Sequence, residues 1–259
     1  MQNDKKVVVI AGGASGIGRT TGFELANRGY RVACIDVNVE AGNQTVAELN
    51  EITEAAFFQC DLSKMDMIKE TVDKIAAHFG RIDALLCAAA ITKHIRVMDI
   101  TEANWDLYLT LDLKAQFFVS QACAGHMVKA GGGRIVHFSS MLGTIGDGKH
   151  ILYGAAKAAL HSMTRELAID FWKDNIQVTA IAPAYVLTPL VARHLDEPGW
   201  KEKQLNAQLN TRMLYPEDIA KTIAFLVTCK TPALNGTVIH TDAGVLSFRF
   251  KPKKMQIEK

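Results

Sequence analysis

Seven short apolar segments alternate along the chain with longer segments in which apolar residues recur at helical spacing. The short segments are predicted strands, at Lys6–Ala11, Arg31–Ile35, Ala56–Cys60, Ala84–Ala89, Arg134–Ser139, Gln177–Ile181 and Thr237–Thr241. The longer segments are predicted helices, at Gly18–Arg28, Val39–Asn50, Lys64–Phe79, Glu102–Lys129, Tyr153–Asn175 and Pro216–Cys229. Strands that are apolar nearly throughout are typical of a sheet covered on both faces. The alternation therefore predicts an α/β fold with a mostly parallel sheet and right-handed crossovers.

Local signals mark several boundaries between these elements. Ser63 is expected to cap the third helix and Gly80 to end it. Pro216 is followed by two acidic residues, which is typical of a helix start because proline fits the first turn and acids favour the positive end of the helix dipole. Residues 184–215 contain two prolines and show no clear periodicity, so we expect an irregular lid there. No linker or internal repeat interrupts the pattern, and residues 1–244 are predicted to form one domain.

Composition and charge exclude several classes of protein. The chain has 259 residues, of which 49% are hydrophobic and 22% charged, and a net charge of +2, which argues against a disordered or a nucleic-acid-binding protein. The longest run of hydrophobic residue types, Ala84–Ile91, is much shorter than the ~20 residues of a membrane helix, and the first residues do not resemble a signal peptide. The 5 cysteines contain no C-x-x-C pair and the 8 histidines no metal-binding spacing. We therefore expect a cytoplasmic protein with buried thiols and no metal.

The charge is distributed unevenly. Residues 245–259 hold five basic residues against one acidic residue, a net charge of +4. The remaining residues then hold 24 basic against 26 acidic ones, or −2. We interpret the chain as a mildly acidic body with a short basic C-terminal tail that is frayed or touches another subunit.

A glycine-rich turn follows the first predicted strand. Gly12, Gly16 and Gly18 open the first predicted helix, where bare backbone amides at the positive end of a helix can bind a pyrophosphate. The second predicted strand leads into Asp36, whose carboxylate can accept hydrogen bonds from an adenosine ribose. The same carboxylate would repel a 2′-phosphate, and no basic residue follows it at Val37 or Asn38. The pattern predicts NAD as the cofactor rather than NADP.

Three further residues form a candidate catalytic group. Tyr153 and Lys157 are four residues apart on a predicted helix and therefore share one face. A cation beside a phenol lowers its pKa toward neutrality, as a general acid/base requires. Ser140 ends the predicted strand before this helix and can hydrogen-bond a carbonyl or alcohol oxygen.

At these residues the chain resembles the short-chain dehydrogenase/reductase family, in its single-domain branch of about 250 residues, from Val7 to Gly244. The turn after Ala11 is similar to the family motif T-G-x-x-x-G-x-G, and Ser140, Tyr153 and Lys157 match the family's catalytic Ser and Y-x-x-x-K. The segment Pro183–Thr188 resembles P-G-x-x-x-T. The resemblance implies a Rossmann-like, doubly wound parallel sheet of about seven strands. It implies NAD-binding positions at Gly12, Ser15, Gly16, Ile17, Gly18, Asp36, Asp61, Leu62, Ala88, Ala89, Tyr153, Lys157, Val186 and Thr188.

The chain departs from the family pattern at two places near the implied site. Cys87-Ala88-Ala89-Ala90 stands where the family has N-N-A-G, which removes two side-chain amides but leaves the backbone contacts available. Asp112 stands where the family has its fourth catalytic residue, an Asn. An ionised Asp only accepts hydrogen bonds, and its charge near Lys157 would raise the pKa of Tyr153. We therefore expect alcohol oxidation to have an optimum at higher pH. Ala184 and Ala243 replace family glycines and stiffen their turns.

The resemblance implies hydride transfer between NAD and a secondary alcohol or ketone. His94, Arg96, Lys149 and His150 flank the expected pocket and favour a polar substrate such as a sugar, polyol or hydroxy acid, while a bulky apolar substrate stays open. Two alternatives are an NADP-dependent carbonyl reductase and a nucleotide-binding sensor or scaffold with little turnover. We expect no nucleic-acid or membrane partner. Apolar faces around Ala115–Met127 and Ala155–Trp172 suit a homodimer or homotetramer, as the family usually forms.

Overall fold

The computed structural model describes residues 5–192, 195–210 and 212–247. Its strands are β1 (Val7–Ala11), β2 (Arg31–Asp36), β3 (Ala55–Gln59), β4 (Ala84–Cys87), β5 (Gly133–Phe138), β6 (Ile176–Pro183) and β7 (Val238–Thr241). Its α-helices are α1 (Gly16–Ala26), α2 (Val39–Leu49), α3 (Met65–Phe79), α4 (Glu102–Leu109), α5 (Ala115–Lys129), α6 (Ile151–Asp170), α7 (Pro189–Ala192), α8 (Trp200–Asn206) and α9 (Pro216–Thr228). Each predicted strand is present, with ends that differ by one or two residues.

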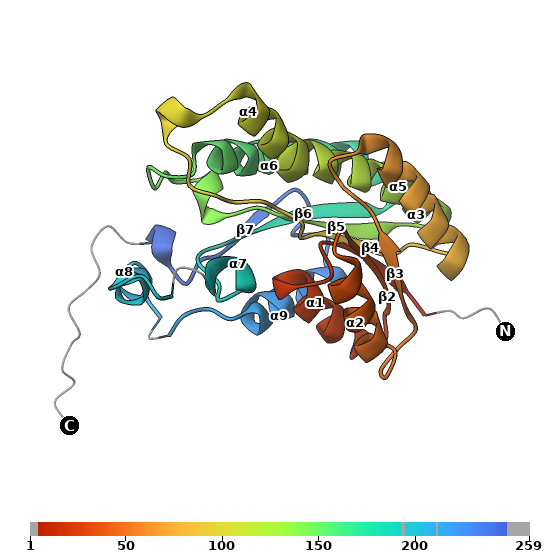
Figure 1. Ribbon diagram of the computed structural model, residues 1–259. Coiled ribbons are helices and arrows are strands. Elements are labelled where there is room, and N and C mark those ends of the chain that lie inside the picture. Colours follow the sequence, from red (N-terminus) through yellow and green to blue (C-terminus); the bar gives the residue numbers. More distant parts are fainter. Residues whose placement is uncertain (1–4, 193–194, 211, 248–259) are drawn as a thin grey trace.

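The seven strands form one parallel sheet in the order β3-β2-β1-β4-β5-β6-β7. Helices α3, α5 and α6 cover one face of it, and α1, α2 and α9 cover the other (Figure 1). The order reverses between β1 and β4, because successive strands are added on one side of β1 and then on the other. In a doubly wound sheet, ligands bind at this switch point, beyond the carboxyl ends of the strands. The predicted Rossmann-like fold is confirmed.

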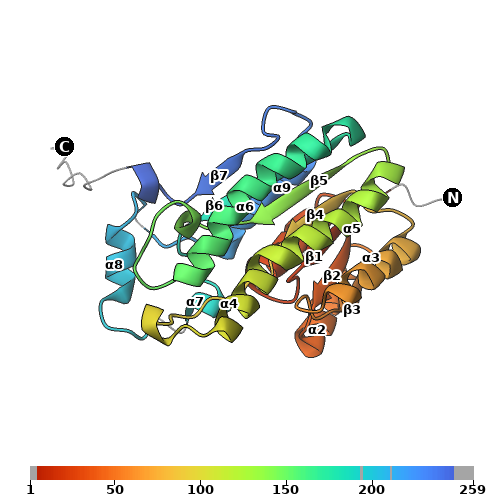
Figure 2. The ribbon, with the colours of Figure 1, turned by 90° about the horizontal axis from the view of Figure 1, so that it is seen from above.

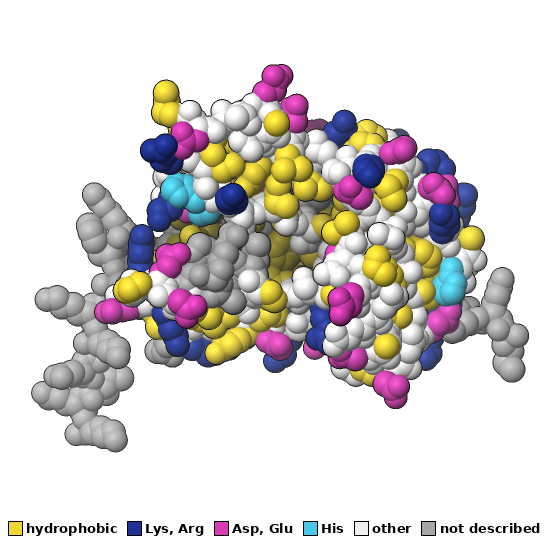
Figure 3. Space-filling model, in the orientation of Figure 1, with side chains coloured by type: hydrophobic (Ala, Val, Ile, Leu, Met, Phe, Trp, Pro, Cys, Tyr) yellow, Lys and Arg dark blue, Asp and Glu magenta, His cyan; other side chains and the backbone are white. Residues whose placement is uncertain are grey.

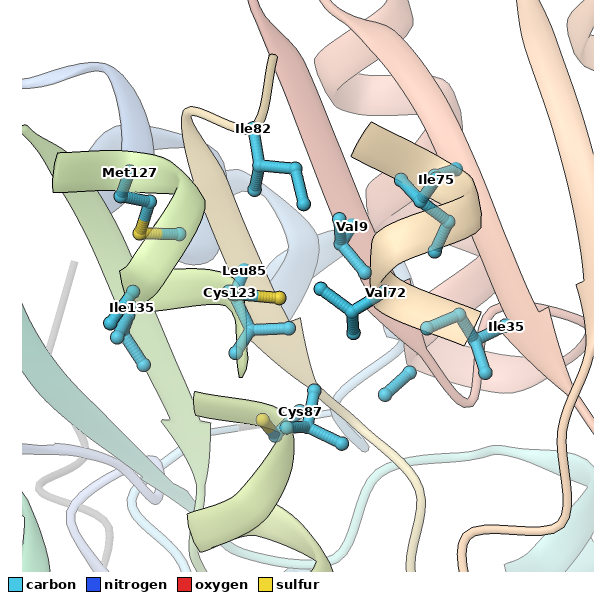
Figure 4. Packing of buried hydrophobic residues seen from close by; sticks show 14 of the residues in the cluster. Val9, Ile35, Val72, Ile75, Ile82, Leu85, Cys87, Cys123, Met127 and Ile135 are labelled. Carbon is cyan, nitrogen blue, oxygen red and sulfur yellow. The ribbon is translucent and has the colours of Figure 1, made fainter. Parts of the chain in front are cut away.

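Alternating residues of β1 explain why both faces of the sheet are covered. Val7 and Val9 face a core cluster with α3 and α5, while Val8 and Ile10 face a second cluster with α1 and α9. Figure 4 shows the first cluster, in which side chains from the two helices meet those of the strands; the labelled residues include Val9, Val72, Leu85, Cys123 and Ile135. A strand buried on both faces has no polar side to display, so it appears in the sequence as an unbroken apolar run.

The predicted helix Glu102–Lys129 is wrong as a single α-helix. It consists of α4, a π-helical turn at Thr110–Lys114 and α5. The π-turn contains one wider hydrogen-bonded ring, and such turns occur frequently at functional sites. The predicted helix Tyr153–Asn175 also ends early: α6 stops at Asp170, and a short 3-10 turn, Trp172–Asp174, leads into β6.

Three further boundary predictions have different outcomes. The helix stop at Gly80 is confirmed, since this residue lies in the left-handed region with φ 79°. The helix start at Pro216 is confirmed too, with Asp218 accepting a hydrogen bond from the Tyr215 amide. The cap at Ser63 is wrong: the α3 N-cap is Lys64, and the Ser63 hydroxyl donates to Asp61 instead. The helix begins one residue later than predicted, so the Ser63 side chain belongs to the turn that Asp61 opens before the helix.

The segment 184–215 is more ordered than predicted. Its described residues include the short helices α7 and α8, so the expectation of an irregular stretch is corrected. Both views place these helices beside each other at one end of the molecule (Figure 2). Of the basic C-terminal tail, residues 248–259 lie outside the described residues.

Four of the five cysteines are buried and Cys229 is half-buried, in agreement with the predicted buried thiols. None of the helices in the described ranges has the length and apolar composition that crossing a bilayer needs. Within the same ranges, no three His, Cys, Asp or Glu side chains come together as a metal-binding group.

Candidate active site

Two cavities meet at the carboxyl ends of the strands. The first cavity, of about 380 Å³, lies over the switch point between β1 and β4, and the second cavity, of about 440 Å³, lies between the loop before α6 and the helices α7 and α8. Figure 3 shows the surface hollowed near its centre, with hydrophobic side chains inside the hollow. Four residues line both cavities, and they are Ile17, Phe138, Tyr153 and Thr188. A molecule in either cavity therefore reaches Tyr153.

The glycine turn forms the floor of the first cavity. Gly12 has φ +84°, and a Cβ added to it would lie 2.5 Å from the backbone nitrogen of Ala89. A Cβ at Gly18 would overlap the carbonyl oxygen of Gly12. Only glycine permits these approaches, which bring the start of α1 directly beneath the cavity.

The start of α1 has unpaired backbone donors of the kind that bind an anion. The N-cap Ser15 makes no side-chain capping hydrogen bond with the described residues, and the first turn contains no acidic residue. The first amide groups of a helix have no partner within the helix, and they lie at the positive end of its dipole. Gly16 and Ile17 of this turn line the cavity. These features fit the pyrophosphate of a dinucleotide.

Asp36 ends β2 beside the glycine turn and lines the same cavity. Its Oδ2 accepts a hydrogen bond from the Ala14 amide at 3.1 Å, and its Oδ1 accepts one from the Asn38 amide at 3.1 Å. The two bonds fix the carboxylate at the rim of the cavity. Among the described residues that line this cavity there is no lysine or arginine. A carboxylate without a neighbouring cation fits a ribose diol better than a 2′-phosphate.

The ends of β3 and β4 also contribute to the first cavity. Asp61 follows β3, and the Ala88–Ala89 pair follows β4. The pKa of Asp61 is lowered, chiefly by the hydrogen bond from the Ser63 side chain, so the group is ionised at neutral pH. The Ala88 and Ala89 amides donate to the carbonyl of Ala11 at 2.7 and 2.8 Å. Backbone bonds thus hold the β4 strand end in place without the side-chain amides that the family motif supplies.

Tyr153 and Lys157 lie one turn apart on α6. The Lys157 ammonium lies 5.2 Å from the centre of the Tyr153 ring and donates to the Phe138 carbonyl at 2.9 Å. Lys157 is fully buried. Ser140 caps the 3-10 turn Met141–Gly143, where its hydroxyl accepts from the Leu142 amide at 3.2 Å. The structure therefore brings the three predicted catalytic residues together.

Asp112 joins this group through the π-turn. Its Oδ1 accepts from the Ile91 amide at 3.2 Å and lies 3.4 Å from Lys157 Nζ. Its side chain is fully buried, and within the described part of the chain Oδ2 has no hydrogen-bond partner. Asp112 is the central residue of the π-turn, so this turn carries the carboxylate that pairs with Lys157.

The electrostatics of the group differ from the sequence expectation. Burial raises the pKa of Tyr153 well above its usual range, the Asp112 charge raises it further, and the Ser140 hydroxyl lowers it. Burial also raises the pKa of Asp112 and lowers the pKa of Lys157, although their mutual attraction opposes both changes. The expected lowering of the phenol pKa by Lys157 is therefore not found, whereas the predicted effect of Asp112 on Tyr153 has the expected sign.

Most of the predicted cofactor positions lie on the first cavity. They are Gly12, Ser15, Gly16, Ile17, Gly18, Asp36, Asp61, Leu62, Ala88, Ala89, Tyr153 and Thr188. Lys157 lies behind Tyr153, and Val186 lines the second cavity. Sequence reasoning missed Phe138, which lines both cavities and resembles any other strand residue in the sequence.

The second cavity is mixed in character. Apolar residues such as Leu142, Val191 and Trp200 line it together with His94, Asp147, Lys149 and His150. His94, Lys149 and His150 were expected from the sequence. The fourth expected residue, Arg96, is not among its lining residues and pairs with Asp99 at 2.5 Å on the surface. Asp147 was missed, because a single acid in a glycine-containing loop has no distinguishing pattern.

Comparisons with known proteins agree with this geometry. A sequence profile of the family described as Enoyl-(Acyl carrier protein) reductase matches residues 12–246. The chain is 31% identical to a D-threitol dehydrogenase of Mycolicibacterium smegmatis, over 93% of each chain. It is 32% identical to an NAD-dependent glycerol dehydrogenase of Listeria innocua, over 92% of this chain and 93% of the relative.

Two solved structures show the same fold. A putative short-chain alcohol dehydrogenase from Sinorhizobium meliloti superposes with a TM-score of 0.89 and 29% identity, over 93% of this chain and 96% of the other. A structure described as ElxO with NADP bound superposes with a TM-score of 0.86 and 27% identity, over 94% of this chain and 100% of the other.

Proposed function

The chain belongs to the short-chain dehydrogenase/reductase family, and from this premise we propose that it transfers a hydride between NAD and a secondary alcohol or ketone. Its relatives support an oxidoreductase that acts on CH–OH groups. The observation that carries the proposal is the position of Tyr153 in the wall shared by the two cavities, beside Ser140 and Lys157. Cofactor and substrate would meet there.

Each residue of the group has a distinct part in this reaction. When bound, the nicotinamide ring supplies or accepts the hydride. In reduction the Tyr153 hydroxyl gives its proton to the carbonyl oxygen and becomes a phenolate, and in oxidation the phenolate takes the proton of the alcohol. The Ser140 hydroxyl orients that oxygen by a hydrogen bond. Lys157 holds the nicotinamide ribose and, paired with Asp112, tunes the pKa of Tyr153.

The first cavity would hold the cofactor through groups that the structure places on or near its wall. Gly12, Gly16 and Gly18, with Ser15 and Ile17, surround the pyrophosphate, and Asp36 accepts from the adenosine ribose. Asp61 and Leu62 contact the adenine. Ala88 and Ala89 offer backbone contacts to the cofactor. Val186 and Thr188 hold the carboxamide of the nicotinamide.

The preference for NAD rests on Asp36. The carboxylate at the cavity rim, without a lysine or arginine among the described lining residues, favours the ribose diol over a 2′-phosphate. An Asp36→Ala variant should bind NAD about 10- to 100-fold more weakly, since a hydrogen bond to a charged group contributes about 1.5–3 kcal/mol. Its affinity for NADP should rise or stay constant. Titration of cofactor fluorescence measures both. Tighter binding of NADP than of NAD by the native protein would instead support the NADP-dependent carbonyl reductase, and a variant that loses both cofactors equally would show a purely structural Asp36.

The proposal is tested by turnover. Purified protein is mixed with NAD and a panel of secondary alcohols, and the absorbance of NADH is followed. A Tyr153→Phe variant should lose at least 100-fold in kcat, because general acid–base catalysis contributes about 10²–10⁴-fold. Its NAD affinity should be unchanged. Full turnover in this variant would refute the role of Tyr153, and NAD binding without turnover of any alcohol would favour a sensor or scaffold.

Two further expectations accompany the proposal. The homodimer or homotetramer is supported by apolar side chains that are exposed on α6, among them Ile151 at 52% and Ile169 at 63%. The cytoplasmic location stays a prediction from the sequence.

A further inference from the structure

A histidine–carboxylate pair lies in the second cavity next to Tyr153. His150 Nδ1 lies 2.7 Å from Asp147 Oδ2, and both residues line the cavity. Tyr185, from the segment after β6, lines the same wall and approaches Asp147 Oδ2 at 3.5 Å. The His94 ring, from the loop after β4, lies 6.5 Å from the His150 ring. Side chains from three separate loops therefore meet at one point.

The hydrogen bonds of this pair leave one acceptor for a ligand. Burial would raise the pKa of Asp147, but hydrogen bonds from the Lys149 backbone and from His150 lower it overall, so the carboxyl is ionised at neutral pH. An ionised carboxylate can only accept, so His150 Nδ1 carries the hydrogen of the 2.7 Å bond. In neutral His150 the second nitrogen, Nε2, is then an acceptor, and it has no partner among the described residues.

The position of His150 relates this acceptor to the reacting atoms. His150 is the N-cap of α6 and lies three residues before Tyr153. Both residues line the second cavity, so one ligand there can contact them together. A substrate whose hydroxyl meets Tyr153 would therefore present a second hydroxyl, on a nearby carbon, to His150.

We propose that the Asp147–His150 pair recognises a second substrate hydroxyl and that the substrate is a diol or longer polyol. This inference rests on the proposed function. The pair orients His150 so that Nε2 accepts the hydrogen of that hydroxyl, while the apolar side chains of Leu142, Val191 and Trp200 cover the carbon chain. The two acids and two lysines that line the cavity balance in formal charge, so the lining has no excess of cations to attract a carboxylate-bearing substrate; they are Asp147, Glu197, Lys149 and Lys203.

The chemistry also disfavours a simple alcohol. A monohydric alcohol would displace water from His150 without replacing its hydrogen bond, which costs about 1–3 kcal/mol. Sites that hydrogen-bond a substrate hydroxyl reject the analogue that lacks it for this reason. The preference for a diol should consequently disappear when the pair is removed.

The test compares butane-2,3-diol with butan-2-ol, which share a four-carbon chain and a secondary hydroxyl. We expect the native protein to have a kcat/KM about 10- to 100-fold higher for the diol. His150→Leu should remove this preference by lowering kcat/KM for the diol and leaving that for butan-2-ol within about threefold. Asp147→Asn, which keeps the shape of the loop, should reduce the preference in the same direction. His78→Leu, at the exposed end of α3, is the matched control and should behave as the native protein.

The outcomes separate the inference from the function on which it rests. Turnover of both alcohols with equal kcat/KM in the native protein overturns the inference alone. If kcat/KM falls equally for both substrates in His150→Leu and in Asp147→Asn, the pair has a structural role and the inference is overturned as well. Turnover of neither substrate with NAD or NADP refutes the proposed function and the inference together.

Discussion

Replacing Asp112 with Asn gives the sharpest test of the electrostatics of the site. Asp112 and Lys157 are both fully buried, with 3.4 Å between Oδ1 and Nζ. Burial favours the neutral form of each group and their attraction favours the charged forms. Whichever of the two holds the proton, the pair has no net charge. The pair therefore stabilises the Tyr153 phenolate much less than a lone Lys157 cation would.

The size of the cancelled effect follows from the geometry. At an effective dielectric constant of about 20, a cation 5.2 Å from the centre of the Tyr153 ring stabilises the phenolate by about 3 kcal/mol. About 1.4 kcal/mol corresponds to one pKa unit. If removal of the Asp112 charge restored the whole stabilisation, the pKa of Tyr153 would fall by about two units. Burial lowers the pKa of Lys157 and removes part of the gain. We expect Asp112→Asn to move the rise of the oxidation rate about one to two units toward lower pH.

The assay is the initial rate of alcohol oxidation with saturating NAD across the neutral and alkaline range. Asp106→Asn is the matched control, since Asp106 is an exposed acid on α4 and undergoes the same chemical change. The control should keep the native profile. If Asp112→Asn also keeps it, the reasoning about the neutral pair is refuted. A parallel loss of rate at every pH, without a shift, would point to a structural role of the carboxylate.

Two other predictions concern stability. Gly18→Ala should lower the free energy of unfolding by about 1–3 kcal/mol and weaken NAD binding, since its Cβ would overlap the Gly12 carbonyl oxygen. Gly125→Ala, in the middle of α5, should raise the free energy of unfolding by about 0.5–1 kcal/mol, because the added Cβ meets open space. Urea titration compares the two variants. Asp218→Ala should cost about 1 kcal/mol at neutral pH, because it removes an N-terminal cap. The hydrogen bond from Arg212 lowers the pKa of Asp218 to about 2, below the unfolded value of about 3.9. The contribution of Asp218 to stability is thus fully present above about pH 4 and is lost as the pH falls toward about 2. Equal stability of Asp218→Ala and the native protein at neutral pH would contradict this prediction.

The strands and the cofactor turn could be predicted from the sequence because local rules determine them. A buried parallel strand must be apolar on both faces, as β1 is, and Gly12 and Gly18 are needed wherever backbone approaches this closely. The π-turn at Thr110–Lys114 could not be predicted, since its residues are equally compatible with an α-helix. The contacts that accompany it are tertiary, since Asp112 within the turn pairs with Lys157 and accepts from the Ile91 amide.

The second cavity was harder to predict for a related reason. Asp147, His94 and Tyr185 come from three loops that are far apart in the sequence, and only the fold brings them together. The helices α7 and α8 were missed because each is shorter than the window over which helical periodicity can be recognised. Sequence patterns thus located the proposed catalytic group better than the residues that line the second cavity.

The two departures from the family motifs form a single local change. The Ile91 amide, which follows the Cys87–Ala90 segment, donates to Asp112 Oδ1, so the replaced strand end and the replaced Asn are joined by one hydrogen bond. The carboxylate accepts this bond as the oxygen of an Asn side chain would, but it replaces the amide donor by a titratable group paired with Lys157. Ser140, Tyr153 and Lys157 stay in mutual reach. A scaffold that has lost catalysis would have no need to keep these three groups together while its second cavity retains an oriented Asp147–His150 pair. The combination favours an enzyme whose phenol titrates at high pH over a binding protein without turnover.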